Sequence, residues 1–404
     1  MERFNWSPPL PPSVPEALFL VGLLVAVFVG FNIGGSSTGV AFGPAVGSGL
    51  VSKLSAAALM SVFALLGGWT VGRNVIDTMG GDIVPQSEFT LAASVGVLFF
   101  VGAALLLSNL FGVPASTSMT AVGAIAGLGV ATGTLDWGVM GRIVTWWLIA
   151  PILAFWVCAV IGRYFYPYLD RRARLGATAG GVVSVEDGRP RLAEDATRRD
   201  LVGAALVVAI GCYMAFSAGA SNVANAVAPL VGSGELGVDG GVVLAGAAIT
   251  IGAFTIARRT LDTVGNDLTD LPLLAALIVE VVSASLITGL SWAGIPASLA
   301  VSATMCIIGL GWGRATRTVK ISDAAGAAVR GEGDPDLSVG ALAAEEAHVE
   351  AGEPVQPIGT EQSDDLVTAD LFDPATTGRV IMLWILTPSI SAAASFFLFR
   401  FAPI

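Results

Sequence analysis

This chain contains little charge, one histidine and few cysteines. Only 13% of its 404 residues are charged, whereas about a quarter is usual in a soluble domain. The single histidine, His348, lies in a polar segment, which excludes a histidine-based metal or hydrolase site. Cys158, Cys212 and Cys306 lie in apolar runs without metal-ligand spacing, so we interpret them as packing residues and expect no metal or cofactor.

The sequence also lacks the motifs of the common catalytic sites. It has no phosphate-loop lysine motif, no pair of catalytic carboxylates and no nucleophile with a matching base. We therefore expect neither an enzyme nor a nucleic-acid-binding protein.

Long uncharged segments take the place of these features. No charged residue occurs from Ala17 to Ser52, from Phe89 to Leu135 or from Ile143 to Gly162. Each run reaches or exceeds the roughly 20 residues that cross a bilayer as a helix. Together with a mean hydropathy of +0.78, these runs predict a multi-pass protein of the cell membrane that contacts the lipid bilayer.

The chain carries one pattern twice. The stretch Phe31–Asp82 aligns without a gap on Phe216–Asp267, so Asp77–Thr78 falls on Asp262–Thr263. Two related hydrophobic halves are typical of secondary transporters, in which the substrate binds between the repeats near the middle of the membrane.

Four short segments, in two matched pairs, interrupt the helical pattern. Ser36–Gly49 and Ser221–Gly234 are dense in glycine, serine and proline, whereas Gly112–Ser116 and Gly294–Ser298 place proline just before serine at an expected helix start. Broken helices at membrane depth occur where they line a cavity, and their free N–H groups can bind an anion. The alternative is that glycine and serine here only permit close helix packing.

The polar segments divide the chain. Between residues 314 and 379 there are 13 acidic and 5 basic residues, which predicts a disordered loop inserted into the second half. The expected organisation is a tail (1–14), a first transmembrane repeat (15–163), a cytoplasmic linker (164–199), the first part of a second repeat (200–313), an acidic cytoplasmic insertion (314–376) and a last transmembrane helix (377–404).

The basic residues predict the orientation of the chain. Arg163, Arg171, Arg172 and Arg174 follow one apolar run, and another basic group begins at Arg314, so the positive-inside rule places both long loops in the cytoplasm. Inverted repeats then leave both termini outside. The expected fold is an all-α membrane protein of two inverted repeats with broken or re-entrant helices and about 10–12 membrane segments. The basic residues are 18 arginines and 2 lysines, and with the acid excess they suggest a salt-loving source.

These motifs resemble those of the inorganic phosphate transporter family, over nearly the whole hydrophobic part of the chain. The second half carries SAGASNVANAVAPLVGSG, RRTLDTVGND and GIPAS, and the first half carries FNIGGSSTGVAFGPAVGSG, NVIDTMGGD and GVPASTSMT. The resemblance is to a haloarchaeal-like member with degenerate signature motifs. It implies phosphate transport coupled to sodium or protons, an oxyanion held at the tips of broken helices, and homodimers.

The chain departs from the family signature, Gly-Ala-Asn-Asp-Val-Ala-Asn-Ala, in both halves. Ser37 and Asn222 occupy the positions of its two aspartates, which could accept the proton of phosphate or hold sodium. The resemblance favours phosphate, while this loss leaves a sulfate or related oxyanion permease as the alternative. The expected substrate-binding residues are Ser36, Ser37, Ser116, Thr117, Ser118, Ser221, Asn222, Asn225 and Ser298.

Acidic residues in or near the membrane are the expected ligands of a coupling ion. Glu280 lies in an apolar segment and corresponds to a glutamate that the family carries there, and a carboxylate at this depth is costly without a function. Asp77, Thr78, Asp262 and Thr263 are either further cation ligands or helix caps.

A membrane sensor or partner-binding scaffold is the remaining alternative. Such a protein would have lost its coupling residues and would use the acidic insertion for interactions. Retention of Ser116, Thr117, Ser118 and Asn225 argues against it, because a scaffold does not need polar groups that are costly in lipid.

Overall fold

The computed structural model describes residues 14–110, 116–173, 183–186, 189–192, 198–255, 272–318 and 374–402. Seven helices within these ranges are long and apolar enough to cross a membrane. Three further apolar helices are shorter, which gives ten apolar helices in the described part of the chain. The predicted all-α membrane fold is confirmed.

The first half of the chain forms the helices up to α7, and a small hairpin follows it. Its elements are α1 (Val14–Gly47), α2 (Lys53–Thr70), α3 (Gly72–Asp77), the π-helix η1 (Thr78–Asp82), the 3-10 turn η2 (Gln86–Glu88), α4 (Leu91–Leu110), α5 (Thr117–Thr132), α6 (Trp137–Val160), the π-helix η3 (Ile161–Phe165) and α7 (Tyr166–Ala173). The antiparallel strands β1 (Val183–Glu186) and β2 (Arg189–Leu192) pair within the segment that was expected to be a plain linker.

The second half repeats this order in the described residues. Its elements are α8 (Arg198–Gly232), α9 (Val238–Thr255), α11 (Leu273–Trp292), α12 (Leu299–Ala315), the 3-10 turn η5 (Thr316–Thr318) and α14 (Pro374–Phe401). The predicted acidic insertion lies outside the described residues, apart from its first and last few positions.

Two of the four expected helix breaks are not present. The segments Ser36–Gly49 and Ser221–Gly234 remain helical through Pro44 and Pro229, so α1 and α8 each run on to the glycine at residue 47 or 232. A proline removes one backbone hydrogen bond, but packing by neighbouring membrane helices compensates for such a loss. Each helix ends two residues before a glycine with positive φ, which is 73° at Gly49 and 78° at Gly234.

Glycines just before these segments allow close helix packing. A Cβ on Gly219 of α8 would lie 2.0 Å from the carbonyl oxygen of Ala64 in α2, and a Cβ on Gly34 of α1 would lie 2.0 Å from that of Ile249 in α9. Small residues allow membrane helices to approach this closely. The first helix of each half therefore packs tightly against the second helix of the other half.

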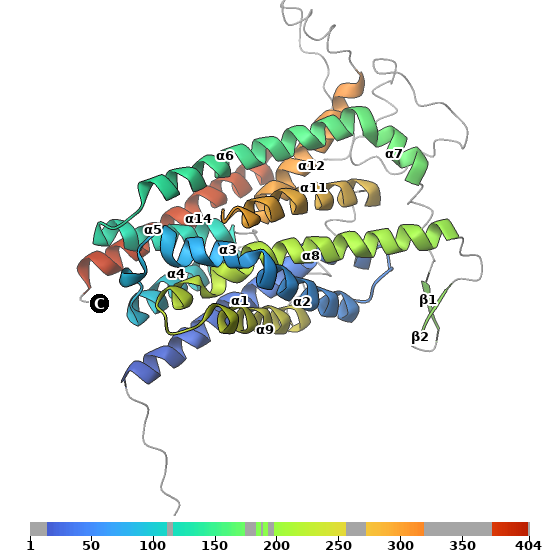
Figure 1. Ribbon diagram of the computed structural model, residues 1–404. Coiled ribbons are helices and arrows are strands. Elements are labelled where there is room, and N and C mark those ends of the chain that lie inside the picture. The colour runs from blue at the N-terminus through green and yellow to red at the C-terminus, as the bar shows by residue number, and fades with distance from the viewer. Residues whose placement is uncertain are drawn as a thin grey trace, which may run out of the picture.

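The other two expected breaks lie between the arms of two re-entrant hairpins. The break Gly294–Ser298 is present, whereas Gly112–Ser116 lies outside the described residues apart from Ser116. The first hairpin, α4–α5, begins and ends at one end of the molecule, because the amide of Asp136 donates to the carbonyl of Ile83 at 3.0 Å. The second, α11–α12, ends at the opposite end, where the Arg317 guanidinium donates to the carbonyl of Arg163 at 2.6 Å. Asp136 caps the start of α6, and Arg163 lies in η3 directly after its end. Helix α6 therefore connects the bases of the two hairpins, as the inverted repeats predict (Figure 1).

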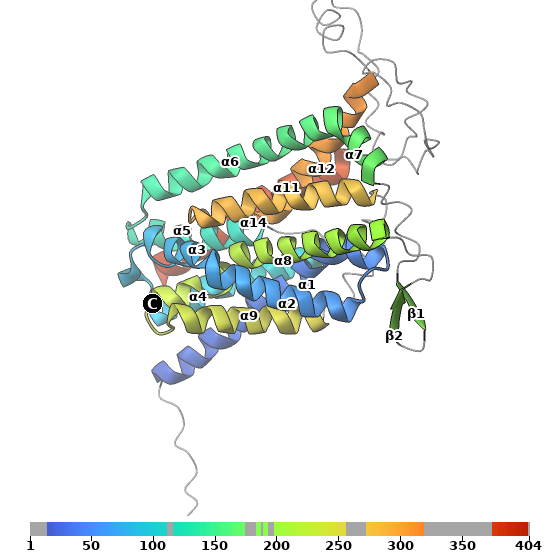
Figure 2. The ribbon, with the colours of Figure 1, turned by 45° about the vertical axis from the view of Figure 1, so that its right-hand side comes forward.

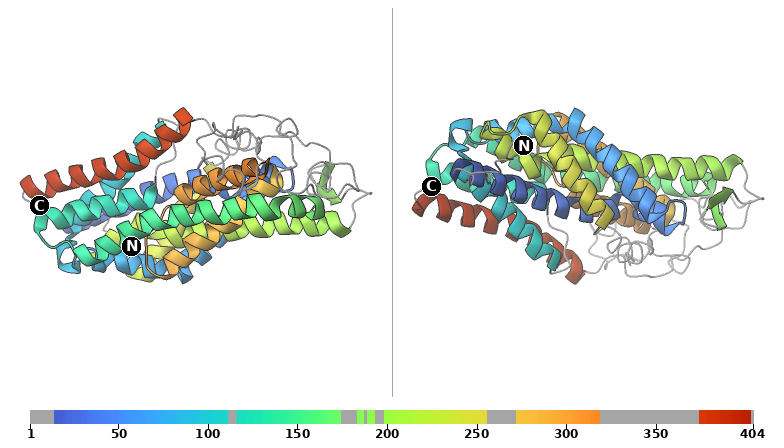
Figure 3. Two further views of the ribbon diagram at one scale, coloured as in Figure 1. Left: turned by 90° about the horizontal axis from the view of Figure 1, so that it is seen from above. Right: turned by 90° about the horizontal axis from the view of Figure 1, so that it is seen from below.

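The last helix of each half packs on the hairpin of the other half. Helix α6 of the first half lies along α12, and α14 of the second half lies along α5. Figure 2 shows α6, α11 and α8 running side by side, and Figure 3 shows that most helices follow the long axis of the molecule. The two halves are thus interlocked rather than separate domains, because each of the two buried hydrophobic clusters contains residues of both halves.

The outer helices expose apolar side chains, as expected in a bilayer. Leu24, Leu148, Ile385 and Phe397 are all more than half exposed on α1, α6 and α14. The start of α1 and the C terminus lie toward one end of the molecule, whereas α7 and the β-hairpin lie toward the other (Figure 1).

Candidate functional site

The site begins at the two hairpin tips, where a serine caps each returning helix. Ser116 caps α5 and accepts a hydrogen bond from the amide of Met119 at 3.3 Å, and Ser298 caps α12 and accepts one from Val301 at 3.3 Å. The proline-then-serine pattern predicted these two helix starts. Each capped helix turns the positive end of its dipole toward the interior.

Five polar side chains at the first tip and on α8 form one hydrogen-bonded group, which we name the tip cluster. Its members are Thr117 and Ser118 of α5 and Ser221, Asn222 and Asn225 of α8. Thr117 donates to Asn222 Oδ1 at 2.7 Å, and Asn225 Nδ2 lies 3.0 Å from Ser118 Oγ and 3.1 Å from Asn222 Oδ1. Ser118, Ser221 and Asn225 are fully buried. The cluster therefore joins the two halves of the chain.

The number of hydrogens on each side chain decides which groups of the tip cluster donate and which accept. The Ser221 hydroxyl donates its one hydrogen to the carbonyl of Ala297 at 2.8 Å, so at the 3.3 Å contact with Ser118 it must accept. Ser118 in turn accepts from Asn225. The bonds thus run from Asn225 through Ser118 and Ser221 to Ala297, which lies in the second tip. One serine connects both tips.

The side-chain amide of Asn225 is not fully satisfied by hydrogen bonds with the described residues. Its Nδ2 carries two hydrogens but faces three acceptors, including Thr117 Oγ1 at 3.2 Å. Its Oδ1 is buried and accepts no hydrogen bond from the described residues. A buried acceptor without a donor is costly, and a ligand that brings a hydrogen there would be stabilised.

Two residues that the sequence did not identify position the second tip. Asn74 of α3 donates to the carbonyl of Trp292 at 2.7 Å, and Trp147 of α6 donates to that of Pro296 at 2.8 Å. With Ser221, they satisfy three backbone carbonyls around the turn from α11 to α12. The repeat alignment could not have found Asn74, because an arginine occupies the matching position of the second half.

The first-half counterparts of the cluster do not join it. Ser36 is exposed on α1, and its hydroxyl lies 3.2 Å from the carbonyls of Asn32 and Ile33 in its own helix. Ser37 is half-buried. The positions equivalent to Thr117 and Ser118 are occupied by Leu299 and Ala300, so the described tips carry one polar arrangement rather than two.

Glu280 lies inside the protein, on α11. Its side chain is 4% exposed, and its Oε1 makes no hydrogen bond with the described residues. A buried carboxylate in this state requires a proton or a cation, because an uncompensated charge at this depth is too costly.

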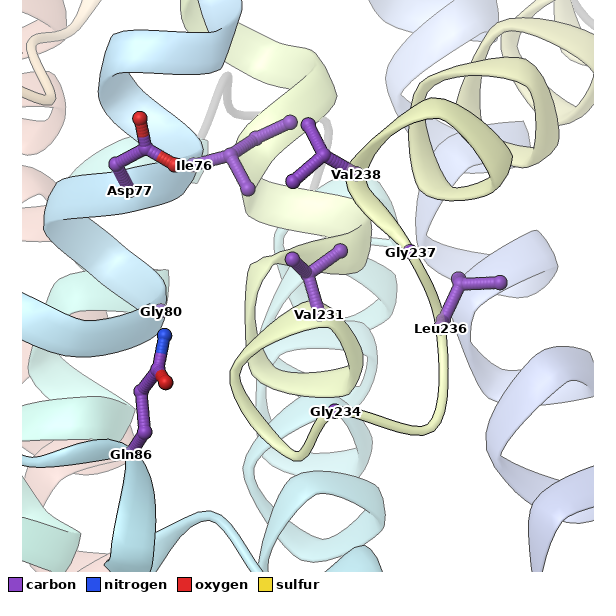
Figure 4. A pocket seen from close by; sticks show the side chains of 9 residues that line it. All are labelled: Ile76, Asp77, Gly80, Gln86, Val231, Gly234, Leu236, Gly237 and Val238. Atoms are coloured by element: carbon purple, nitrogen blue, oxygen red, sulfur yellow. The ribbon is translucent and has the colours of Figure 1, made fainter.

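Asp77 ends α3 and Thr78 begins η1, and the two side chains lie in different surroundings. Asp77 is exposed and lines a pocket of about 230 Å³ together with Gln86 and the turn Val231–Val238 (Figure 4). Thr78 is buried against the second tip, where a Cβ on Gly294 would come within 2.8 Å of its hydroxyl. A π-helix of this kind is often found at functional sites. Asp262 and Thr263 lie outside the described residues.

Comparisons with known proteins find a matching family model, similar permeases and a similar solved structure. A family model described as the phosphate transporter family matches residues 33–395. The sulfate permease CysP of Bacillus subtilis is 31% identical over 296 residues, covering 72% of this chain and 77% of that protein. A candidate phosphate permease of Pyrococcus furiosus is 23% identical over 368 residues, covering 75% and 89%. The solved structure of a sodium-dependent phosphate transporter has a TM-score of 0.64 at 17% identity and covers 95% of this chain and 98% of its own.

Proposed function

Because this chain belongs to the phosphate transporter family, we propose that it is a secondary transporter that moves inorganic phosphate across the cell membrane through the tip cluster. The main support is the meeting of both re-entrant tips at buried hydroxyl and amide groups. Thr117, Ser118 and Asn225 supply donors beside the amino-terminal end of α5, which is a favourable place for an anion. An entering oxyanion would replace the hydrogen bonds that these groups now make with one another.

Asn225 Oδ1 supports phosphate in particular. It is a buried acceptor without a donor among the described residues. Near neutral pH phosphate carries at least one proton and can donate it, whereas sulfate only accepts hydrogen bonds. An amide oxygen at this position would therefore take over part of the role of the missing signature aspartates.

Sulfate is the second candidate, and a specific observation favours it. All five side chains of the tip cluster are uncharged, because Asn222 stands where the family signature has an aspartate. A neutral cluster does not repel a dianion. The 31% identity to a sulfate permease points the same way.

A panel of matched oxyanions tests the two candidates. Purified protein in liposomes should take up phosphate, and arsenate should compete because it is also protonated. Sulfate and selenate have the same tetrahedral shape but carry no proton, so they should compete weakly. Competition by sulfate and selenate alone would assign the protein as a sulfate carrier. Absence of uptake for all four anions would contradict oxyanion transport itself.

Asn222→Asp sharpens the same test. The new carboxylate would accept a proton from phosphate and repel sulfate, so the ratio of phosphate to sulfate uptake should rise, by roughly tenfold if the difference is about 1.4 kcal/mol. Asn222→Ser is the matched control, because it removes the amide without adding charge. An equal ratio in both variants would mean that residue 222 does not face the substrate.

The proposed transport is coupled to a cation, sodium or a proton, with Glu280 as its principal ligand. Its burial supports this role, and so does its Oε1, which receives no hydrogen bond from the described residues. Asp77 and Thr78 are proposed as a secondary group near the second tip, although only Thr78 is buried. Oxygen ligands of this kind suit sodium.

We also propose that the end carrying α7 and η5 faces the cytoplasm. Arg163, Arg171, Arg172, Arg314 and Arg317 all lie there. The positive-inside rule then places the start of α1 and the C terminus outside. A cysteine introduced at the C terminus of the protein should therefore be labelled in intact cells. Labelling only after cell lysis would contradict this orientation.

A further inference from the structure

Two basic segments about 150 residues apart meet at one end of the molecule. The guanidinium of Arg163 donates to the carbonyl of Thr316, and the guanidinium of Arg317 donates to the carbonyl of Arg163 at 2.6 Å. Both arginines are buried, at 5% and 2% exposure. The guanidinium of Arg314 lies 4.3 Å from the ring centre of Tyr166. The joint between α6 and α12 thus holds three arginines.

Helix α7 leaves this joint with an exposed apolar and basic surface. The π-helix η3 turns the chain from α6 into α7, as Figure 1 shows. Phe165, Tyr168 and Leu169 are 55%, 61% and 40% exposed, and Arg171 and Arg172 are also exposed. On the preceding helix α6, Trp156 and Val160 are 52% and 45% exposed.

We propose that this surface binds a phospholipid with an anionic headgroup. The acyl chain would lie along Val160 and Phe165, and the headgroup phosphate would contact Arg171 and Arg172. Aromatic and basic residues at the membrane boundary are suited to these two parts of a lipid.

The exposed apolar side chains of α7 favour a lipid over a free anion as the ligand of this surface. A soluble phosphate or sulfate ion would need only the arginines and would leave Phe165, Tyr168 and Leu169 in water. Asp170 is the single acidic residue of α7, so the helix keeps a net positive charge. A lipid is the occupant that matches both the charge and the exposed apolar area.

Titration of the purified full-length protein with phosphatidylglycerol, followed by native mass spectrometry, tests this proposal. Phosphatidylcholine with the same acyl chains serves as the neutral lipid. The wild-type protein should bind phosphatidylglycerol more tightly. The double variant Arg171→Gln/Arg172→Gln should weaken this binding about 25-fold, because each basic residue near an anionic lipid contributes roughly fivefold. Arg171→Lys/Arg172→Lys should retain it within a few fold.

The control variant is Arg142→Gln/Arg400→Gln, which removes the same charge from exposed positions at the opposite end of the molecule. It should bind phosphatidylglycerol like the wild type. Equal binding of the two lipids by the wild type, or equal losses in both glutamine variants, would overturn the proposal. Displacement of the lipid by millimolar phosphate or sulfate would also overturn it, because the site would then take a soluble anion.

Discussion

Replacement of Ser221 by alanine tests whether one hydroxyl connects the two hairpin tips. Ser221 Oγ donates to the carbonyl of Ala297 at 2.8 Å and accepts from Ser118, whose Oγ is 3.3 Å away. Ser118 is fully buried, and Ala297 is 3% exposed. The alanine variant would leave a hydroxyl and a carbonyl without their partners in a buried place.

The expected cost follows from the number of bonds lost. Hydrogen bonds between membrane helices contribute about 0.6 kcal/mol on average and at most about 1.7. A buried group without a partner costs about 1–3 kcal/mol in soluble proteins. With two bonds lost, we expect Ser221→Ala to reduce the free energy of unfolding by about 1–2 kcal/mol. The missing hydroxyl leaves too little space to add a large cavity term.

Ser217→Ala is the matched control. Ser217 lies one turn earlier on α8, is also fully buried, and donates to the carbonyl of Ala284 at 3.0 Å. That carbonyl belongs to the body of α11 rather than to a tip. This variant loses one bond and should cost about 0.6 kcal/mol. It should leave substrate binding unchanged.

Two measurements separate stability from positioning. Unfolding in mixed micelles titrated with a denaturing detergent gives the stability of each variant. Uptake kinetics give the KM for phosphate, which should rise roughly tenfold in Ser221→Ala, equivalent to about 1.4 kcal/mol, and stay constant in Ser217→Ala. The double variant Ser118→Ala/Ser221→Ala should lose less than the sum of the single variants, because the two serines share one bond. Equal KM values in both single variants, or strict additivity, would refute the connection.

Three further changes have distinct expected results. Gly252→Ala should lower the amount of folded protein sharply, because its Cβ would lie 2.0 Å from the carbonyl oxygen of Phe31. In the control Gly289→Ala the new Cβ meets nothing within 4 Å, so thermal unfolding should show that this variant is tolerated. Glu280→Gln should weaken the cation dependence of uptake by roughly tenfold, and unchanged sodium and pH profiles would exclude it as the coupling residue. Deletion of residues 323–373 should leave uptake largely intact, and loss of uptake by a variant that reaches the membrane would contradict this.

The sequence predicted the all-α membrane fold and its two corresponding halves because these signals are local and duplicated. Membrane helices are identified by apolar length, and the ungapped repeat fixes which elements correspond. The proline-then-serine pattern correctly placed the starts of α5 and α12, since a helix cap depends on residues within one turn. The predicted substrate-binding residues include all five members of the tip cluster, but Ser221, Asn222 and Asn225 were named from the family resemblance and from a segment that was expected to be broken and is helical.

Only the tertiary structure decided which signals mark breaks and which mark contacts. The segments Ser36–Gly49 and Ser221–Gly234 were interpreted as helix breaks, but α1 and α8 continue through them. Gly34 and Gly219, just before these segments, each lie against a carbonyl from another helix, which no local pattern contains. Trp147 and Asn74 act on the second tip through backbone carbonyls far away in sequence, so nothing near them indicated that role. The repeats determine that two tips exist. The packing of the two halves decides that Ser221 joins the tips, because a hydrogen bond across their interface depends on the positions of helices from both halves.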